Sequence, residues 1–331
     1  MQYQQFTPEM RKTHTILVPN MLPIHFRLLI SIFGQFGYHM ELLESSSRTV
    51  VEEGLKNVHN DTCYPALLVV GQFIEALKSG KYDPDKTALL ITQTGGGCRA
   101  SNYIHLLRKC MAQQFPQVPV ISLNFAGLEK ASGFQLTLPL CIKLVYGVLY
   151  ADLLMTIYNQ CRPYELNEGE SQKTLEQWQD KLDKLFRTND YRHTKKWYRA
   201  MLEDFAAIPR SQKPKIRVGI IGEIYVKYSP LANNHLEDFL LQEGCEPVVP
   251  TLMSFVLYCA ANSENNANSI NTATCIPHCS ALATNSYTAS RWKPFAVCRS
   301  MAYLRQCMTL KNCGKRRTNI PIKASAWAKA G

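Results

Sequence analysis

Short apolar runs alternate with segments of helical periodicity between residues 13 and 158. The first apolar run, 14–18, ends at the helix-breaking sequence PNMLP and is followed by a segment in which Phe26, Leu29, Ile30 and Phe33 recur at helical spacing. Strand–helix–strand alternation favours a parallel sheet with helices on both faces. The predicted strands are 14–18, 39–43, 87–92 and 118–124, and the predicted helices are 24–37, 50–58, 63–78, 101–115 and 138–158.

A second unit of the same type is predicted further along the chain. In the segment 165–214, residues 165–208 are polar and helix-favouring. We expect this segment to form two amphipathic helices that join two domains. From Lys215 the pattern predicts a strand at 216–226, a helix at 233–243 and a strand at 246–249. The fold class is therefore α/β, with two Rossmann-like or flavodoxin-like parallel-sheet units joined by a helical segment and an irregular C-terminal tail. The predicted boundaries are 1–12 (lead), 13–164, 165–214, 215–259 and 260–331 (tail).

The tail differs from the rest of the chain in charge and composition. Of the net charge of +11 in 331 residues, the segment 260–331 contributes ten Lys/Arg against the single acid Glu264, whereas residues 1–259 hold 27 bases and 25 acids. The nearly neutral main body gives no electrostatic reason to expect nucleic-acid binding. Two interpretations of the tail stay open: a disordered basic extension, which would be the only part suited to nucleic acid, or a sequence read out of frame.

The N-terminal sequence lacks the basic start and apolar core of a secretory signal, and the longest apolar stretch, 144–155, is interrupted by Asp152 and too short to span a bilayer. We therefore expect a cytoplasmic protein without membrane attachment. The twelve cysteines should then be reduced, which favours metal binding or simple burial over a disulfide scaffold.

Two cysteines stand at predicted helix starts directly after polar turns: Cys63 in NDTCYP and Cys98 in TGGGCRASN. The unpaired N–H groups of a helix N-terminus stabilise an anion, so a thiolate there suits a nucleophile or an iron–sulfur ligand. Flanking glycines let the backbone approach and donate to cluster sulfurs. We predict Cys63 and Cys98 as metal ligands, with cofactor contacts from Gly95, Gly96, Gly97 and Asn102. The alternative is that Cys63 merely begins a helix and that the glycines merely form a turn.

Other motifs are weaker. Neither G-x-G-x-x-G nor the Walker sequence G-x-x-x-x-G-K-[ST] occurs, so an anion-binding turn is the most that the glycine triplet supports. Cys110, Cys141 and Cys161 lie in or beside predicted helices and are expected to be packing residues. The tail sequence CIPHC offers possible zinc ligands but is not followed by a second ligand pair.

The histidines lack a recognisable catalytic partner in the sequence. His25, His105 and His235 are therefore expected to be ordinary surface or core residues. His59, four residues before Cys63, is the one candidate proton donor.

Several long strings together resemble a known family: HTILVPNMLPIHFRLL, KNVHNDTCYPALLVVGQFIEAL, TQTGGGCRASNYIHLLRK, VPVISLNFAGLEK and VGIIGEIYVKYSPLANNHLEDFLLQEG. They are similar to the dehydratase-like region of the proteins related to 2-hydroxyacyl-CoA dehydratase and its activase, over about residues 10–258. The resemblance implies an oxygen-sensitive iron–sulfur protein, with a 4Fe-4S cluster, that receives low-potential electrons from an ATP-dependent activase and acts on a CoA thioester.

Cys63 and Cys98 fall on cysteines of the family pattern. The family supplies further cysteine ligands from a C-terminal segment that residues 260–331 do not match, so the resemblance implies an incomplete ligand set and a truncated product. No ATPase motif is present, so ATP hydrolysis would belong to a partner module or chain. The alternative function is a non-catalytic α/β module that docks an activase ATPase or a dehydratase subunit.

Overall fold

The computed structural model describes residues 3–59, 61–93, 103–124 and 133–258. Its main sheet has four parallel strands in the order β2-β1-β3-β4. All four were predicted from the sequence, and the α/β class with a parallel sheet is confirmed. The strands are β1 (Thr15–Pro19), β2 (His39–Leu43), β3 (Thr87–Gln93) and β4 (Val120–Asn124).

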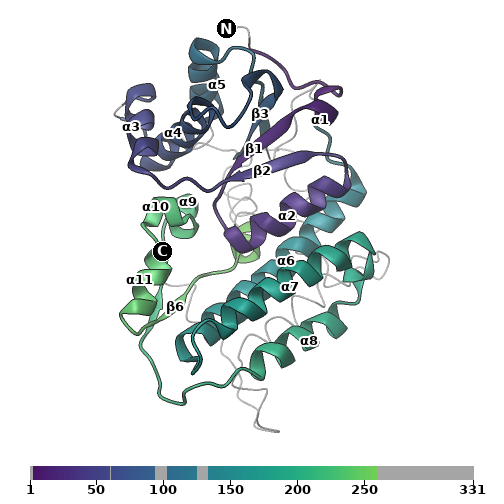
Figure 1. Ribbon diagram of the computed structural model, residues 1–331, viewed down its shortest axis with the longest axis vertical. Helices are drawn as coiled ribbons and strands as arrows, with labels where there is room; N and C mark the ends of the chain where they lie inside the picture. Colours follow the sequence, from purple (N-terminus) through teal and green to yellow (C-terminus); the bar gives the residue numbers. More distant parts are fainter. Residues whose placement is uncertain (1–2, 60, 94–102, 125–132, 259–331) are drawn as a thin grey trace, which may run out of the picture.

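Helices cover both faces of this sheet, as the strand order requires (Figure 1). On one side lie α3 (Arg48–Asn57), α4 (Tyr64–Lys78) and α5 (Tyr103–Gln114); on the other lies α2 (Pro23–Gln35). The short α1 (Met10–Thr13) precedes β1, and the 3₁₀ turn η1 (Pro84–Lys86) precedes β3.

Alternate residues of each strand belong to two different cores. In β1, Ile16 and Val18 pack with α2, whereas Leu17 packs with α4 and α5. In β3, Leu90 joins the first core and Leu89 the second. Because successive strand side chains point to opposite faces, an apolar run without polar alternation is the pattern of a strand buried on both sides.

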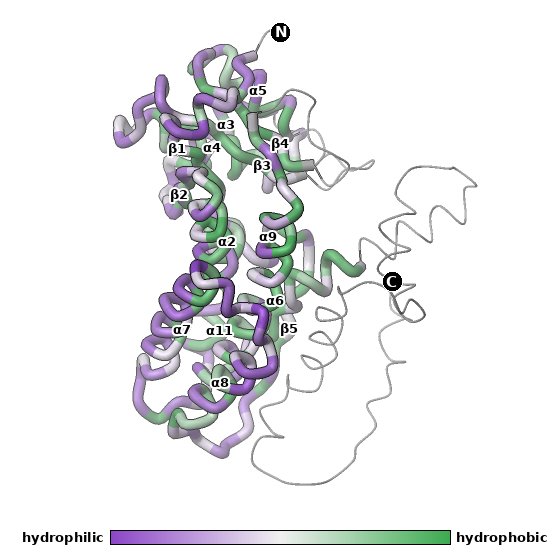
Figure 2. The backbone as a smooth tube through the Cα atoms, turned by 90° about the vertical axis from the view of Figure 1, so that its right-hand side faces the viewer, coloured by the Kyte–Doolittle hydropathy of each residue, from purple (hydrophilic) through white to green (hydrophobic). Residues whose placement is uncertain are grey.

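Three further helices extend the first core away from the sheet. They are α6 (Leu138–Cys161), α7 (Glu170–Arg187) and α8 (Thr194–Ala206). The 3₁₀ turn η3 (Arg162–Tyr164) follows α6, and the 3₁₀ turn η4 (Asp190–Arg192) lies between α7 and α8. The two amphipathic helices predicted in this part of the chain are α7 and α8. Figure 2 shows α7 as predominantly hydrophilic, while its buried side, with Trp178 and Leu182, packs into the core shared with α2 and α6.

Within the described residues, α6 with the turn after it is the one helix long and apolar enough to cross a membrane. This is weak evidence for a span, because 61% of its most apolar window is buried inside the protein. Its neighbours are α2, α7 and α8. Burial of this extent is also found in the core helix of a folded domain.

The second unit has a two-stranded parallel sheet, β5 (Arg217–Gly219) and β6 (Glu246–Val248). The predicted strand 216–226 is wrong beyond Gly219, because the chain turns at Gly222 (φ 150°) and then forms a helix. The Glu223 carboxylate accepts a hydrogen bond from the Val226 amide (3.0 Å) and so caps that helix. The helices of this unit are α9 (Ile224–Tyr228), α10 (Pro230–Asn233) and α11 (Leu236–Gln242).

Candidate functional site

Cys63 begins α4 at the carboxyl edge of the main sheet. It is the N-cap residue, in extended conformation (φ −65°, ψ 148°), and its carbonyl accepts the amides of Ala66 (3.0 Å) and Leu67 (3.3 Å). Pro65 lies in the first turn, where its missing N–H removes no helical hydrogen bond. The structure therefore confirms that a helix starts at this cysteine.

The Cys63 thiol is half-buried and lies against the first residue of α5. Its Sγ atom is 2.6 Å from the hydroxyl oxygen of Tyr103. The starts of α4 and α5 therefore meet on one side of the sheet, and both helices begin at the edge where the parallel strands end (Figure 1). In open α/β sheets this edge is where ligands usually bind.

The remaining predicted site residues are outside the described residues. These are Gly95, Gly96, Gly97, Cys98 and Asn102, which the sequence places between the end of β3 and the start of α5. The zinc-like sequence CIPHC and the whole basic tail are also outside the described part of the chain.

Two other cysteines have the packing role predicted for them. Cys110 is buried and donates its thiol hydrogen to the Asn57 carbonyl (3.1 Å), and Cys161 is buried with its Sγ 3.7 Å from the Phe205 carbonyl oxygen. Burial raises the pKa of both thiols. Because metal ligation requires the thiolate, both are poor ligands.

Cys141 and Cys245 are half-buried, on α6 and before β6 respectively. Among residues 3–59, 61–93, 103–124 and 133–258, no three His, Cys, Asp or Glu side chains come together as a metal site. The described part of the chain therefore offers Cys63 alone at the sheet edge as a candidate cluster ligand.

A second feature of the same edge is a cleft of about 380 Å³ beside the ends of β1 and β2. Asn20 and Glu44, which directly follow these strands, line it on one side, and residues of α6 and α11 line the other. The Asn20 side-chain oxygen is buried and has no hydrogen-bond donor among the described residues. The cleft wall thus contains a buried acceptor that a bound molecule could satisfy.

Acidic groups of the cleft are held by side chains from α6 and the turn after it. Asn159 donates to the Glu237 carboxylate (2.8 Å), and Arg162 pairs with Asp238 (2.9 Å). Burial raises the pKa of Glu237, against the opposing effect of the Asn159 hydrogen bond. Burial therefore disfavours the charged form of Glu237.

The turn before α11 is strained. Asn234 (φ 54°) and His235 (φ 56°) are consecutive non-glycine residues in the left-handed region, which costs about 1–2 kcal/mol for each. This turn directs His235 into the cleft, with its Nδ1 3.6 Å from the Asp238 carboxylate. Sequence analysis missed this group, because Asn159 and Arg162 are more than seventy residues from their partners Glu237 and Asp238 and share no motif with them.

Helix α9 contacts both features of the sheet edge. Tyr225 packs into the core with α4 and α5, on the side of Cys63, whereas Tyr228 lines the cleft. The hydroxyl of Ser229, which follows α9, donates to the Asn20 carbonyl (3.3 Å). The second unit is thus attached to the carboxyl edge of the first sheet between Cys63 and the cleft.

The histidines differ from one another in environment. His59 is 78% exposed and pairs with Asp61 (3.4 Å), so the neighbour that the structure gives to Cys63 is Tyr103 rather than His59. His25, in contrast, is fully buried, and its Nε2 is 2.8 Å from Asp152 Oδ1. In the sequence, this pair was indicated only by Asp152, an aspartate inside the longest apolar run.

Comparisons with known proteins gave no relatives. No family model, curated protein or solved structure matches the chain.

Proposed function

We propose that this chain is an iron–sulfur redox component with Cys63 and Cys98 as cluster ligands. It would receive low-potential electrons from an ATP-dependent activase and act on a CoA thioester, as in the proteins related to 2-hydroxyacyl-CoA dehydratase. The observation that carries the proposal is the position of Cys63, a half-buried thiol at the N-cap of a fifteen-residue helix on the carboxyl edge of a parallel sheet.

The surroundings of Cys63 fit a cluster ligand. The Cys63 sulfur lies at a helix N-terminus, whose unpaired N–H groups favour a nearby negative charge such as that of a cluster, and the Tyr103 hydroxyl at 2.6 Å can donate a hydrogen bond to the sulfur. Hydrogen bonds of this kind orient ligands and tune the potential of a cluster. Tyr103 follows Cys98 by five residues in the sequence, so a cluster held by Cys63 would take its second thiolate from the connection between β3 and α5.

A bound cluster would supply one-electron transfer. In this chain, Cys63 and Cys98 would be the ligands of the cluster. The backbone N–H groups at Gly95, Gly96 and Gly97 and the side chain of Asn102 would donate hydrogen bonds to it. A four-iron cluster needs three or four protein ligands, so the proposal also requires ligands from beyond these two cysteines. A partner chain, the one carrying the activase, would supply them.

Anaerobic reconstitution with iron and sulfide tests this function. We expect the wild-type chain to take up both elements, and we expect the variants Cys63→Ser and Cys98→Ser to take up several-fold less, because each loses a thiolate ligand. Cys245→Ser is the matched control, since this half-buried thiol precedes β6 in the second unit, and it should match the wild type. Iron and acid-labile sulfide are measured per chain, with circular dichroism to verify folding.

Equal uptake by all four proteins would contradict the cluster assignment. If the chain then still captured an activase or dehydratase subunit without both thiols, the interaction-module function would replace the redox function.

A further inference from the structure

Two polar side chains of the cleft at the sheet edge have no partner among the described residues. The side-chain oxygen of Asn20 is buried and accepts no hydrogen bond, and the Glu44 carboxylate takes part in no hydrogen bond or ion pair there. The other polar side chains that line the cleft are all hydrogen-bonded or paired within the same part of the chain, as Tyr158 is to Gln172 (2.8 Å). Because buried polar atoms are nearly always satisfied, the Asn20 oxygen points to a ligand with a hydrogen-bond donor.

The pairing of β1 with β2 places Asn20 and Glu44 next to each other. Pro19 is opposite Leu43 in the parallel register, and the two polar residues come directly after this pair. Neighbouring strands are about 5 Å apart, and both side chains line the cleft. One group of a bound molecule can therefore reach both acceptors.

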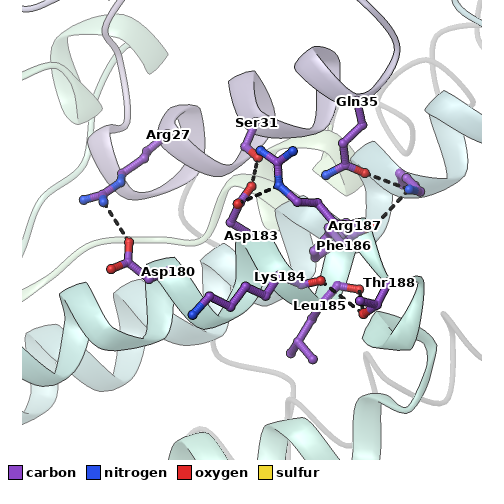
Figure 3. Close-up of polar contacts among 11 residues, drawn as sticks. Arg27, Ser31, Gln35, Asp180, Asp183, Lys184, Leu185, Phe186, Arg187 and Thr188 are labelled. Carbon is purple, nitrogen blue, oxygen red and sulfur yellow. Dashed lines mark hydrogen bonds and ion pairs between the residues drawn. The ribbon is translucent and has the colours of Figure 1, made fainter.

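The arginines of the cleft do not neutralise Glu44, because each has an aspartate of its own. Arg27 pairs with Asp180 of α7 (3.1 Å), as Figure 3 shows. Arg162 pairs with Asp238 of α11 (2.9 Å). Glu44 is thus a carboxylate without a compensating cation in the described part of the chain, and it favours a positively charged ligand.

An organic ammonium group fits this pair of acceptors. It has three N–H donors and no acceptor, so it can donate to the Asn20 oxygen and to the Glu44 carboxylate at once. A hydrogen bond to a carboxylate from a charged donor is roughly twice as strong as one between neutral groups. A metal ion fits less well, because it needs more ligands and no three His, Cys, Asp or Glu side chains of the described residues come together.

The wall near these acceptors is apolar. Leu22 and Met155 are each 3% exposed, and together with Leu42 they line the cleft. The volume of about 380 Å³ is in the range of pockets for small molecules. The carbon skeleton of a bound amine would pack against these side chains.

We propose that the cleft binds a small primary amine with an apolar body, whose ammonium group donates hydrogen bonds to the Asn20 side-chain oxygen and to the Glu44 carboxylate. The site uses none of the proposed cluster ligands. It gives the carboxyl edge of the sheet a binding role separate from the redox function.

Ligand-observed NMR titration of the full chain tests the proposal with three probes of equal length: hexylamine, hexan-1-ol and hexanoate. They carry a cation, a neutral donor and an anion on the same apolar chain. We expect hexylamine to bind about tenfold more tightly than hexan-1-ol, the scale of a charged hydrogen bond, and hexanoate to bind most weakly. Equal affinities for hexylamine and hexan-1-ol would overturn the proposal.

Two variants separate the two acceptors. Glu44→Gln should weaken hexylamine about tenfold and leave hexan-1-ol nearly unchanged, because only the charge is lost. Asn20→Ala should weaken both probes several-fold, and it should still fold because the lost oxygen accepts no hydrogen bond among the described residues. An unaltered hexylamine affinity in either variant would contradict the assignment.

Two controls accompany these variants. Glu52→Gln, which changes an exposed carboxylate paired with Arg48 on α3, should bind all three probes as the wild type does. Cys63→Ser should also match the wild type, so a failure of the cluster proposal does not affect this measurement. Circular dichroism verifies that each variant is folded.

Discussion

Replacing Asp152 with alanine is expected to lower the free energy of unfolding by about 3–5 kcal/mol, because the substitution removes a buried carboxylate that takes part in three hydrogen bonds. The Asp152 side chain is 3% exposed and His25 is fully buried. The variant leaves His25 without its acceptor, and Nδ1 of the same ring already has no partner among the described residues.

Asp152 also anchors the last described helical turn. Its Oδ1 accepts the Leu252 amide (2.8 Å) and its Oδ2 the Met253 amide (2.9 Å). One carboxylate in the middle of α6 thus fastens α2 and the chain beyond β6 to the same point. Loss of the carboxylate leaves three groups without their partner at once, the buried His25 ring and two part-buried amides, which places the expected effect at the high end for a single substitution.

Urea unfolding of three variants measures this effect. Asp152→Asn retains one acceptor oxygen and should lose less stability than Asp152→Ala. Glu52→Ala removes an exposed (i, i+4) pair with Arg48 and should change stability by no more than about 0.5 kcal/mol. A loss below about 1 kcal/mol in Asp152→Ala would show that the pair does not hold these elements together.

Gly71→Ala and Gly34→Ala are expected to change stability in opposite directions. Helices α3 and α4 cross closely, and a Cβ on Gly71 would lie 2.0 Å from the Val50 carbonyl oxygen and 2.8 Å from the Gly54 amide nitrogen. Because backbone atoms must move, we expect Gly71→Ala to destabilise the protein by about 1–3 kcal/mol. A Cβ on Gly34, which is exposed near the end of α2, meets nothing within 4 Å. Gly34→Ala should gain up to about 1 kcal/mol from helix propensity.

Thermal and urea unfolding of the two glycine variants check this pair of predictions. The same chemical change at two helical positions isolates the effect of the α3–α4 approach. A stabilising Gly71→Ala would contradict the close packing of these helices.

The sequence predicted the main sheet well because β1, β3 and β4 are buried on both faces. Runs such as 14–18 and 87–92 have no polar face, and breakers or helical periodicity mark where they end. The same rule failed at 216–226, because an apolar run without alternation also suits a buried helix segment. The signal for the correct structure was local: Gly222 for the turn and Glu223 for the cap of α9.

The polar sites were less predictable because they depend on distant residues. His25 and Asp152 are 127 positions apart, and Asn159 and Glu237 are 78 apart, so no spacing connects them. Asn20 and Glu44 follow different strands, and only the pairing of β1 with β2 places them side by side. Cys63, in contrast, was identified by its local helix-start sequence, and the structure agrees on the helix start.

The most direct test of the account is whether Cys63 and Cys98 are neighbours in the native chain. The cluster-free protein is treated anaerobically with dibromobimane, which joins two thiols only when they lie close together, and is then digested for mass spectrometry. The account predicts a cross-linked peptide containing both Cys63 and Cys98, which is absent after unfolding in urea at low protein concentration. Separate modification of the two cysteines in the native protein, without a peptide that joins them, would contradict a shared site at the sheet edge.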